Sequence, residues 1–253
     1  MRQLFLLLFS LFVTVVSLNA QVIGGKQDKL FDMYLLEKYE ACYARALKMT
    51  ETEKYRSDPE PYLYASMCIV KFKEVDPEAF DYYGGLKMAL KFGEKAMKYH
   101  AKCEKKNIAT YALEDNIEFY NELVTIGLEE ALYHINEDKF SKGASWLKKV
   151  AKVRKDDENI QLALGASMLL SKNAEGQKII DVVVPQIKEK YKSGDAVPDD
   201  ITRDALITGF IIYARYLNES GRSSEAQDFI TMGKEIFPDN LKITRSYDEL
   251  VGS

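Results

Sequence analysis

From about residue 28 to the end of the chain, apolar side chains recur three and four positions apart, which is the spacing of one face of an α-helix. The same stretch has no convincing run of alternating apolar and polar residues, so it predicts no β-strand. Most of its few proline and glycine residues fall between the periodic segments, where they end one helix and begin the next. The sequence therefore predicts an all-α protein.

The predicted helices are joined by short connections, so consecutive helices are expected to be antiparallel neighbours. One helix or a helical pair is expected over about 28–53, and Gly84-Gly85 is expected to bend or break the start of a later one. The remaining helices are expected over about 60–75, 77–102, 111–136, 139–154, 157–172, 174–192, 199–220 and 222–237, with a short one from about 240.

The first twenty residues differ in composition from the rest. Arg2 supplies a positive charge, residues 4–18 are almost wholly apolar, and residues 18–20 end on a small alanine, as in a cleaved export signal. The apolar core of about 15 residues is short for a membrane span, which needs about 20. We therefore expect residues 1–20 to be a signal peptide of a periplasmic protein with no stable membrane span after cleavage. The alternative is an uncleaved N-terminal anchor.

Composition argues against several classes of partner and site. Without residues 1–20 the chain has 34 basic and 39 acidic residues and a net charge of −5, so no nucleic-acid partner is expected. The odd number and wide spacing of Cys42, Cys68 and Cys103 match no disulfide framework or metal motif. We expect each to be a small core residue, with a disulfide between two of them as the open alternative in an oxidising compartment.

Residues 207–240 have small and bulky side chains at fixed positions of a two-helix unit. Small residues stand where the two helices would cross, a glycine stands in the turn, a bulky residue lies between hairpins, and a proline ends the second helix. At these positions the segment resembles the tetratricopeptide repeat, a helical hairpin of about 34 residues. The six matching residues are Ala214, Gly221, Ala226, Ile230, Gly233 and Pro238.

A second copy over 124–157 matches less closely. Ala131 and Gly143 occupy small sites and Leu147 the bulky one, with residues 138–140 at the turn. Val150 is larger than the usual alanine, and a lysine replaces the closing proline.

The third copy, over 159–192, is poorer still. Ala166 matches in the first helix and Asn173 lies at the turn, but Lys178 stands where a small residue is expected. Pro185 falls inside the second helix and is expected to kink it. The alanines at 131 and 166 are 35 residues apart, and the loop over about 192–200 explains the longer step of 48 to Ala214.

Upstream segments are expected to extend the same architecture. Residues 58–103 resemble a divergent hairpin, with Leu86, Ala89, Gly93 and Ala96 on its second helix. Residues 21–57 are expected to form an N-terminal helix or capping hairpin, and residues 104–253 the repeats with a C-terminal capping helix. The resemblance implies stacked antiparallel hairpins that form an α-solenoid like that of tetratricopeptide proteins. An ordinary helical bundle is the alternative.

In tetratricopeptide proteins the first helices of the hairpins line a concave groove that holds a peptide or a segment of another protein. The resemblance therefore implies that partner-binding side chains come from these helices. The family's clamp for a peptide carboxylate is not clearly reproduced, and we assign none. The candidate groove residues are Asn121, Asn136, Arg203, Arg215 and Asn218.

No catalytic constellation is recognisable in the sequence. His100 and His134 are the only histidines, and we expect neither to have a second metal ligand three or four residues away on its helix. Adjacent acids such as 156–157 and 199–200 stand at helix starts, where capping explains them. No nucleophile elbow and no glycine-rich phosphate loop is present. We therefore expect no enzyme, no metal site and no cofactor.

Two further features suit either packing or binding. A basic group lies on the second helix of the middle repeat, close to its C-terminus, at Lys148, Lys149, Lys152, Arg154 and Lys155. We expect it to be a solvated face, with a contact for an acidic partner as the alternative. Tyrosines and a tryptophan fill grooves between hairpins but are also favoured at interfaces. These aromatic residues are Tyr62, Tyr64, Tyr82, Tyr83, Tyr99, Tyr111, Tyr120, Tyr133, Trp146, Tyr213 and Tyr216.

Export and repeats together favour a non-enzymatic scaffold or adaptor that binds a protein or peptide partner in the cell envelope, for instance in a secretion complex. Such a protein would be periplasmic, or held at the outer membrane through its partner. The rival hypothesis is a periplasmic carrier that encloses a small solute in a tyrosine-rich groove for a transporter. The expected new N-terminus, Gln21, also resembles those of exported proteins of Bacteroidota.

Overall fold

The computed structural model describes residues 27–192, 194 and 196–252, and over these residues the chain is all-helical, with no strand. The predicted all-α class is therefore confirmed. The predicted signal peptide, residues 1–20, lies outside the described residues. Among the helices that the structure describes, none combines the length and the apolar character that crossing a membrane requires.

The described helices follow the predicted segments closely. Residues 28–53 form a helical pair, which was one of the two forms expected there. The long helix expected from about 111 begins at 117, after a turn and a short 3₁₀-helix over 111–116. In chain order the elements are α2 (Asp28–Leu35), α3 (Tyr39–Glu51), α4 (Pro59–Val75), α5 (Pro77–Tyr82), α6 (Gly85–Glu104), η1 (Glu114–Asn116), α7 (Ile117–Asn136), α8 (Phe140–Val153), α9 (Glu158–Leu170), α10 (Glu175–Tyr191), α11 (Arg203–Glu219), α12 (Ser223–Ile236) and α13 (Leu241–Val251).

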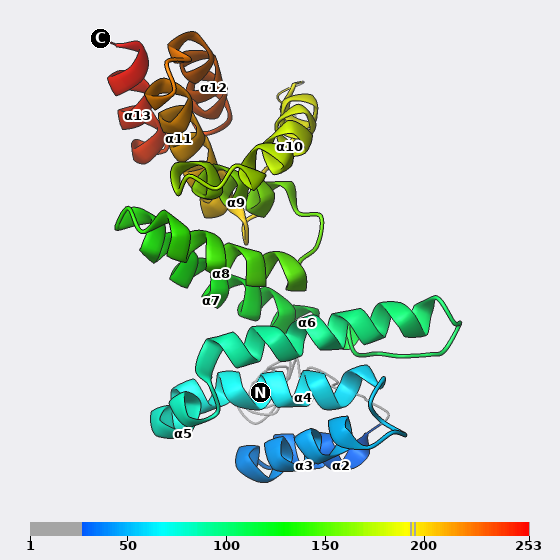
Figure 1. Cartoon of the computed structure of the whole chain (residues 1–253). Helices are drawn as coiled ribbons and strands as arrows, with labels where there is room; N and C mark the ends of the chain where they lie inside the picture. The colour runs from blue at the N-terminus through cyan, green and yellow to red at the C-terminus, as the bar shows by residue number, and fades with distance from the viewer. Residues whose placement is uncertain (1–26, 193, 195, 253) are drawn as a thin grey trace, which may run out of the picture.

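Helices that are neighbours in the sequence pack against one another in pairs. α3 packs on α4, α4 on α6, α7 on α8, α9 on α10, and α11 on α12. Figure 1 shows these pairs following one another along the molecule, from α2 and α3 at one end to α11, α12 and α13 at the other. The pairs are joined in turn by contacts of α6 with α8, of α8 with α9, and of α9 with α11.

Four of the turns that join consecutive described helices share one backbone geometry. In each, a residue with positive φ ends the first helix, and the next N–H donates to the carbonyl oxygen five residues back, as in a Schellman motif. Such a turn satisfies carbonyl groups that the helix end would otherwise leave unpaired. The positive-φ residues are Glu37 between α2 and α3, Asp138 between α7 and α8, Lys172 between α9 and α10, and Gly221 between α11 and α12. The predicted need for positive φ at Gly221 is confirmed.

Helix α9 is buried on nearly every side, because α8, α10 and α11 all pack on it. Such burial requires small residues where the backbones approach. A Cβ atom on Gly176 of α10 would lie 2.5 Å from the carbonyl oxygen of Gly165 and 3.0 Å from the backbone nitrogen of Leu169. A Cβ on Gly209 of α11 would lie 2.7 Å from Cγ of Leu162. Glycine is therefore required on both helices that flank α9.

The contact at Gly176 corrects one sequence-based assignment. We expected the small crossing site of this hairpin at position 178, where the chain has a lysine. The structure places Gly176 at the crossing, whereas the exposed Lys178 pairs with Glu175 at 2.8 Å. The shift of two residues has two equal parts. Lys172 follows Ala166 by six residues where Asp138 follows Ala131 by seven, and Gly176 follows Lys172 by four residues where Gly143 follows Asp138 by five.

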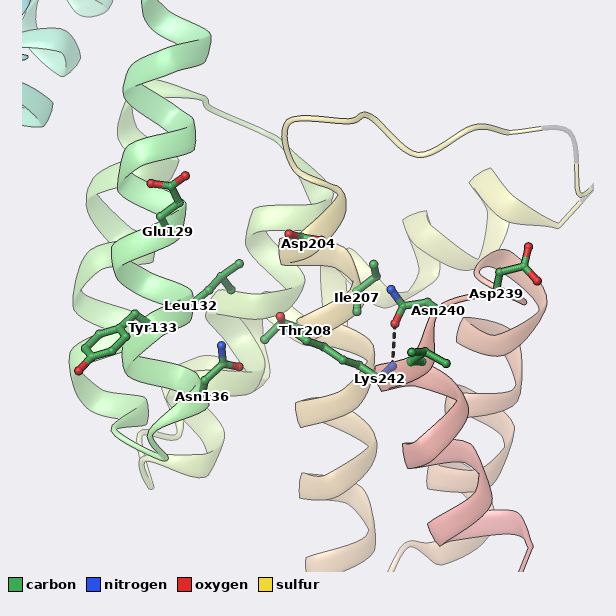
Figure 2. Close-up of a pocket in the computed structure, with 11 residues that line it drawn as sticks. Glu129, Leu132, Tyr133, Asn136, Asp204, Ile207, Thr208, Asp239, Asn240 and Lys242 are labelled. Carbon is green, nitrogen blue, oxygen red and sulfur yellow. Dashed lines mark hydrogen bonds between the residues drawn. The ribbon is translucent and has the colours of Figure 1, made fainter.

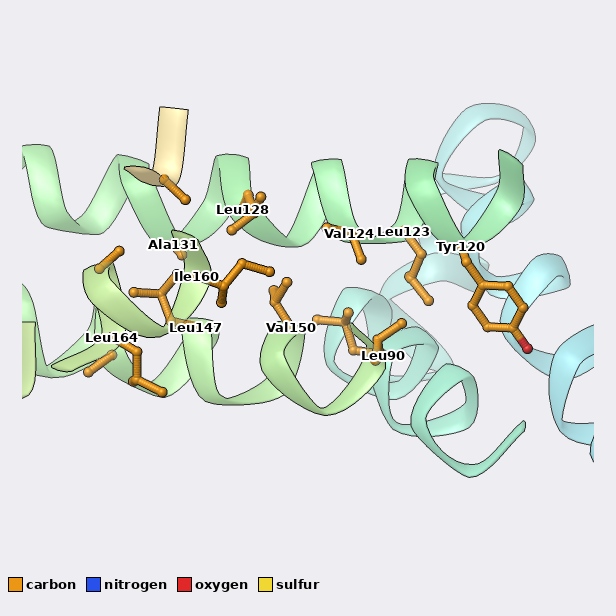
Figure 3. Packing of buried hydrophobic residues seen from close by; sticks show 14 of the residues in the cluster. Leu90, Tyr120, Leu123, Val124, Leu128, Ala131, Leu147, Val150, Ile160 and Leu164 are labelled. Atoms are coloured by element: carbon orange, nitrogen blue, oxygen red, sulfur yellow. The ribbon is translucent and has the colours of Figure 1, made fainter. Parts of the chain in front are cut away.

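The oversized Val150 of the middle hairpin is accommodated by a glycine on the facing helix. A Cβ on Gly127 of α7 would lie 2.6 Å from Cγ2 of Val150 and 3.4 Å from Leu90 of α6. Figure 3 shows Val150 and Leu90 filling the space beneath α7, close to Leu123 and Val124. The absence of a side chain at Gly127 makes room for the larger side chain of Val150, so this part of the core stays closely packed.

We predict that Gly176→Ala destabilises the protein by about 2–3 kcal/mol, because the added methyl group meets backbone atoms that cannot rotate away. Chemical unfolding measured by circular dichroism tests this value. Gly221→Ala is the matched control, since nothing lies within 4 Å of its Cβ position and only its φ of +76° opposes the change. We expect that variant to lose about 1 kcal/mol. Equal losses in both variants would contradict close packing at Gly176.

The three cysteines differ in their access to solvent. Cys42 of α3 and Cys68 of α4 are fully buried, whereas Cys103 is partly exposed, and none is in a disulfide. A hydrogen bond with Cys42, together with burial, raises the pKa of the Cys68 thiol. The prediction of small core residues is therefore confirmed for Cys42 and Cys68.

We predict that a thiol reagent such as dithionitrobenzoate labels Cys103 first, and labels Cys42 and Cys68 only as the protein unfolds. Buried, protonated thiols are poor nucleophiles and are shielded from the reagent. Stopped-flow absorbance before and after adding denaturant measures the phases, and Cys103→Ser should remove the fast one. Rapid labelling of all three thiols in the native protein would contradict this burial. An intact mass short of two hydrogen atoms would instead reveal a disulfide.

Candidate functional site

A hollow of about 630 Å³ lies between α7, α11 and the start of α13. Figure 2 shows side chains from all three elements facing it. We call this hollow the α7–α11 groove. Its lining residues are Glu129, Leu132, Tyr133 and Asn136 of α7, Asp204, Ile207 and Thr208 of α11, and Asp239, Asn240, Leu241 and Lys242 at the start of α13.

Two local features place α13 at the end of the groove. The side-chain oxygen of Asn240 accepts hydrogen bonds from the backbone N–H groups of Lys242 and Ile243, both at 3.1 Å, and so caps the helix. Ile243 is fully buried and holds the first turn of α13 against the core. With its first turn fixed, α13 presents Leu241 at the groove, where the residue is 84% exposed.

The groove combines acidic and apolar side chains. Glu129, Asp204 and Asp239 supply three carboxylates against the single ammonium group of Lys242. Tyr133 is 58% exposed, and like Leu241 it is a large side chain that the core does not use. An acidic surface with exposed apolar side chains fits a segment that carries basic and apolar residues. The groove lining contains no histidine or cysteine.

The five residues predicted to bind a partner are placed in different surroundings. Asn136 lines the α7–α11 groove, and Asn121 lines a second hollow beside the N-terminal half of α7. The Arg203 guanidinium lies 5.7 Å from the ring centre of Phe237. Asn218 accepts a hydrogen bond from the hydroxyl of Ser223 at 2.8 Å.

Arg215, the fifth predicted residue, joins two hairpins. Its guanidinium donates to Asp138 in the α7–α8 turn at 2.7 Å and to Glu219 on its own helix at 2.8 Å. These hydrogen bonds raise the pKa of Arg215 above its usual value. The guanidinium also lies 5.3 Å from the ring centre of Phe140. Arg215 thus connects α11 to the α7–α8 hairpin. For all five residues, a role in binding a partner stays a prediction.

The sequence contained a signal for the groove that the repeat alignment did not use. Tyr133 stands off the buried stripe of α7, which passes through Leu128, Ala131 and Ile135. A large aromatic side chain on the polar side of a helix is a candidate for binding. The acids at 129 and 204 carried no comparable signal, because acids are ordinary on exposed helix faces.

Many of the aromatic residues pack inside the hairpins. Tyr62 lies 5.1 Å from Tyr99 between ring centres, and Tyr43 lies 4.5 Å from Tyr83. The α7–α11 groove has one tyrosine, Tyr133, among its lining residues, and the second hollow has one, Tyr120. Packing therefore explains much of the aromatic content.

The basic group at the end of α8 borders a third hollow, of about 530 Å³, between α6 and α8. Lys149 and Lys152 face Lys87 and Lys91 across it, with Glu94 as the acid that lies 3.5 Å from Lys152. Burial, followed by repulsion from Lys87 and Lys152, lowers the pKa of Lys149. This surface is electropositive, in contrast to the α7–α11 groove.

Comparison with known proteins adds no family assignment: no protein-family model matches the chain, and no significant match is found among curated proteins.

Residues 199–202, directly before α11, are held by ion pairs of Arg154 beside the second hollow. Arg154 donates to Asp157 at 2.9 Å and to Asp199 at 2.8 Å. Burial alone would raise the pKa of Asp199. The hydrogen bond and charge of Arg154, with the N–H groups of Thr202 and Ile201, outweigh burial and hold that pKa below its usual range. The pair therefore stabilises the folded protein while Asp199 is ionised.

We predict that Asp199→Asn lowers the melting temperature at neutral pH and that the difference from wild type narrows as the pH falls. A carboxyl with a lowered pKa stabilises the fold above the unfolded pKa of about 3.9 and stops doing so below its folded value. Because Asp199 is 40% exposed, the neutral-pH effect should stay below about 1 kcal/mol. Scanning fluorimetry at several pH values measures it, with Asp200→Asn as control. A difference that is constant with pH would contradict the ion pair.

Proposed function

We propose that this protein is a non-enzymatic scaffold or adaptor that binds an extended segment of another protein in the α7–α11 groove. The observation that carries the proposal is that one hollow is lined both by exposed apolar side chains and by acids. The apolar residues are Tyr133 and Leu241, and the acids are Glu129, Asp204 and Asp239. Large apolar side chains in solvent cost free energy that a partner can recover by covering them. The expected partner segment carries basic residues next to apolar or aromatic ones.

A tetratricopeptide-like solenoid is part of the same proposal, and the geometry of the turns supports it. The positive-φ residues Asp138 and Lys172 are 34 residues apart, which is the period of that repeat. In three hairpins, buried residues follow the positive-φ position at the same offsets of five, nine and twelve. These residues are Cys42, Ala46 and Met49 after Glu37; Gly143, Leu147 and Val150 after Asp138; and Ala226, Ile230 and Gly233 after Gly221.

The hairpin α9–α10 departs from that regularity in a way that bears on the groove. Its buried residues Gly176, Ile180 and Val183 follow Lys172 at four, eight and eleven positions, one fewer than in the other hairpins. The connection 192–202 then leads to α11, which packs on α9 and also contacts α7. This placement of α11 is what brings two first helices together around one hollow.

The proposed location is the periplasm, in a complex of the cell envelope or of secretion. The supporting observation is the export-type pattern of residues 1–20, and attachment at the outer membrane would come through the partner.

The rival proposal, a carrier for a small solute, draws on the second hollow. That hollow measures about 540 Å³ and is lined largely by apolar side chains such as Met97, Leu113, Ile117 and Val124. Its size falls in the range of small-molecule sites. A specific solute would raise the melting temperature by mass action, so a thermal-shift screen of metabolites tests this alternative.

We predict that a C-terminally tagged protein recovers a stoichiometric partner from its native envelope extract, and that the double variant Tyr133→Ala, Leu241→Ala loses it. Removing two central apolar contacts should weaken binding by at least about tenfold. Asp204→Lys should also weaken binding, with a dependence on salt. Quantitative mass spectrometry of the captured proteins measures each variant against wild type.

Tyr82→Ala is the matched control, because Tyr82 is 82% exposed on α5, far along the chain from the groove, and its loss should leave recovery unchanged. Equal recovery by the groove variants would place the binding surface elsewhere. Recovery of no protein, with a small molecule retained in the native mass spectrum, would favour the carrier.

A further inference from the structure

The end of α6 and the start of η1 bring one imidazole and two carboxylates together. His100 and Glu104 are one helical turn apart on α6, and Glu114 is the first residue of η1. The Nε2 atom of His100 lies 3.6 Å from a carboxylate oxygen of Glu104 and 3.6 Å from one of Glu114. One ligand atom from each of the three residues lies within 4.8 Å of the others.

Packing alone does not account for His100. Only 1% of the residue is exposed, and neither of its ring nitrogens has a hydrogen-bond partner among the described residues. A separation of 3.6 Å is longer than a hydrogen bond between nitrogen and oxygen. A buried polar group without a partner is unfavourable, so its retention at this position calls for a ligand that the ring nitrogen can bind.

The arrangement fits a metal ion in both spacing and chemistry. A tetrahedral ion with bonds of about 2.0–2.2 Å to nitrogen and oxygen holds its ligands roughly 3.3 Å apart, close to the 3.6 Å from His100 to each glutamate oxygen. The Glu104 and Glu114 side chains are each 59% exposed, so they can turn toward the ion without disturbing the core. Imidazole combined with carboxylates suits divalent transition metals such as zinc.

We propose that His100, Glu104 and Glu114 bind one divalent transition-metal ion of the zinc class, which ties the connection 105–113 to the end of α6. Water completes the coordination on the exposed side of the two carboxylates. Nδ1 of His100 has no acceptor of the kind that orients many ligating histidines, so we expect weaker binding than at fully built zinc sites.

The site is independent of the proposed groove. Glu114 precedes the N-terminus of α7, whereas the groove residues of α7 begin at Glu129. The expectation that neither histidine has a second ligand at helical spacing was wrong, because Glu104 stands one turn after His100 on α6. Glu114 becomes a neighbour only through folding.

The test is titration of the untagged, chelator-treated full chain with Zn²⁺ by isothermal calorimetry, and with Co²⁺ by absorbance. Wild type should bind one equivalent of each ion, with a Zn²⁺-dependent rise in melting temperature. Glu104→Gln and Glu114→Gln should each lower the affinity at least tenfold, and His100→Gln should abolish binding. The two glutamate variants alter exposed side chains, so their melting temperatures without metal should match that of wild type.

Two controls separate this site from other ligands. His134 lies 3.3 Å from Glu130 on α7 in a pair of the same helical spacing, and His134→Gln should leave binding unchanged. Cys103→Ser should also leave it unchanged, although that thiol stands next to Glu104. The proposal is overturned if wild type binds no Zn²⁺, if both glutamate variants bind as wild type does, or if Cys103→Ser abolishes binding.

Discussion

The close approach of α9 to its neighbours is the contact on which the C-terminal half of the molecule depends. With Gly165 and Gly176 backbone to backbone, α10 lies near enough to cover one side of α9, and Gly209 allows α11 to cover another. Burial of nearly all of α9 follows, and with it a large share of the apolar area that stabilises this half. The position of α11 relative to α7, and therefore the α7–α11 groove, is set by the same contact.

The sequence predicted the helices well because their determinants are local. Apolar spacing, Asp58-Pro59 and Asp76-Pro77 before α4 and α5, and the polar turn residues all act within a few positions. The crossing site of α10 was misplaced by two residues because this hairpin is one residue shorter on each side of its positive-φ position, and a turn of polar residues gives no sign of that difference. Gly127 opposite Val150 was equally hidden, since the compensation lies across an interface.

The candidate sites were less predictable because they join residues from separate elements. Asn136 was expected to face a groove and does line one, whereas Arg215 and Asn218 have partners within the protein. Which side of α11 faces α7 depends on the orientation of α11 against α9, and that orientation is set by the packing of the core. The basic α6–α8 hollow was visible only in part: Lys149 and Lys152 belong to the basic group found in the sequence, whereas Lys87 and Lys91 join them through the packing of α6 on α8.

The contact of α11 with α7 passes over a complete hairpin, whereas many of the other packed helices are close neighbours in the sequence. During synthesis, the hairpins up to α8 can form as soon as their own residues are available, since each needs only local contacts. The Arg215–Asp138 bridge and the first turn of α13 must wait for the last fifth of the chain. A nascent or C-terminally truncated chain therefore presents folded helices without the groove, and the surface that we propose for a partner exists only once the last helices have packed.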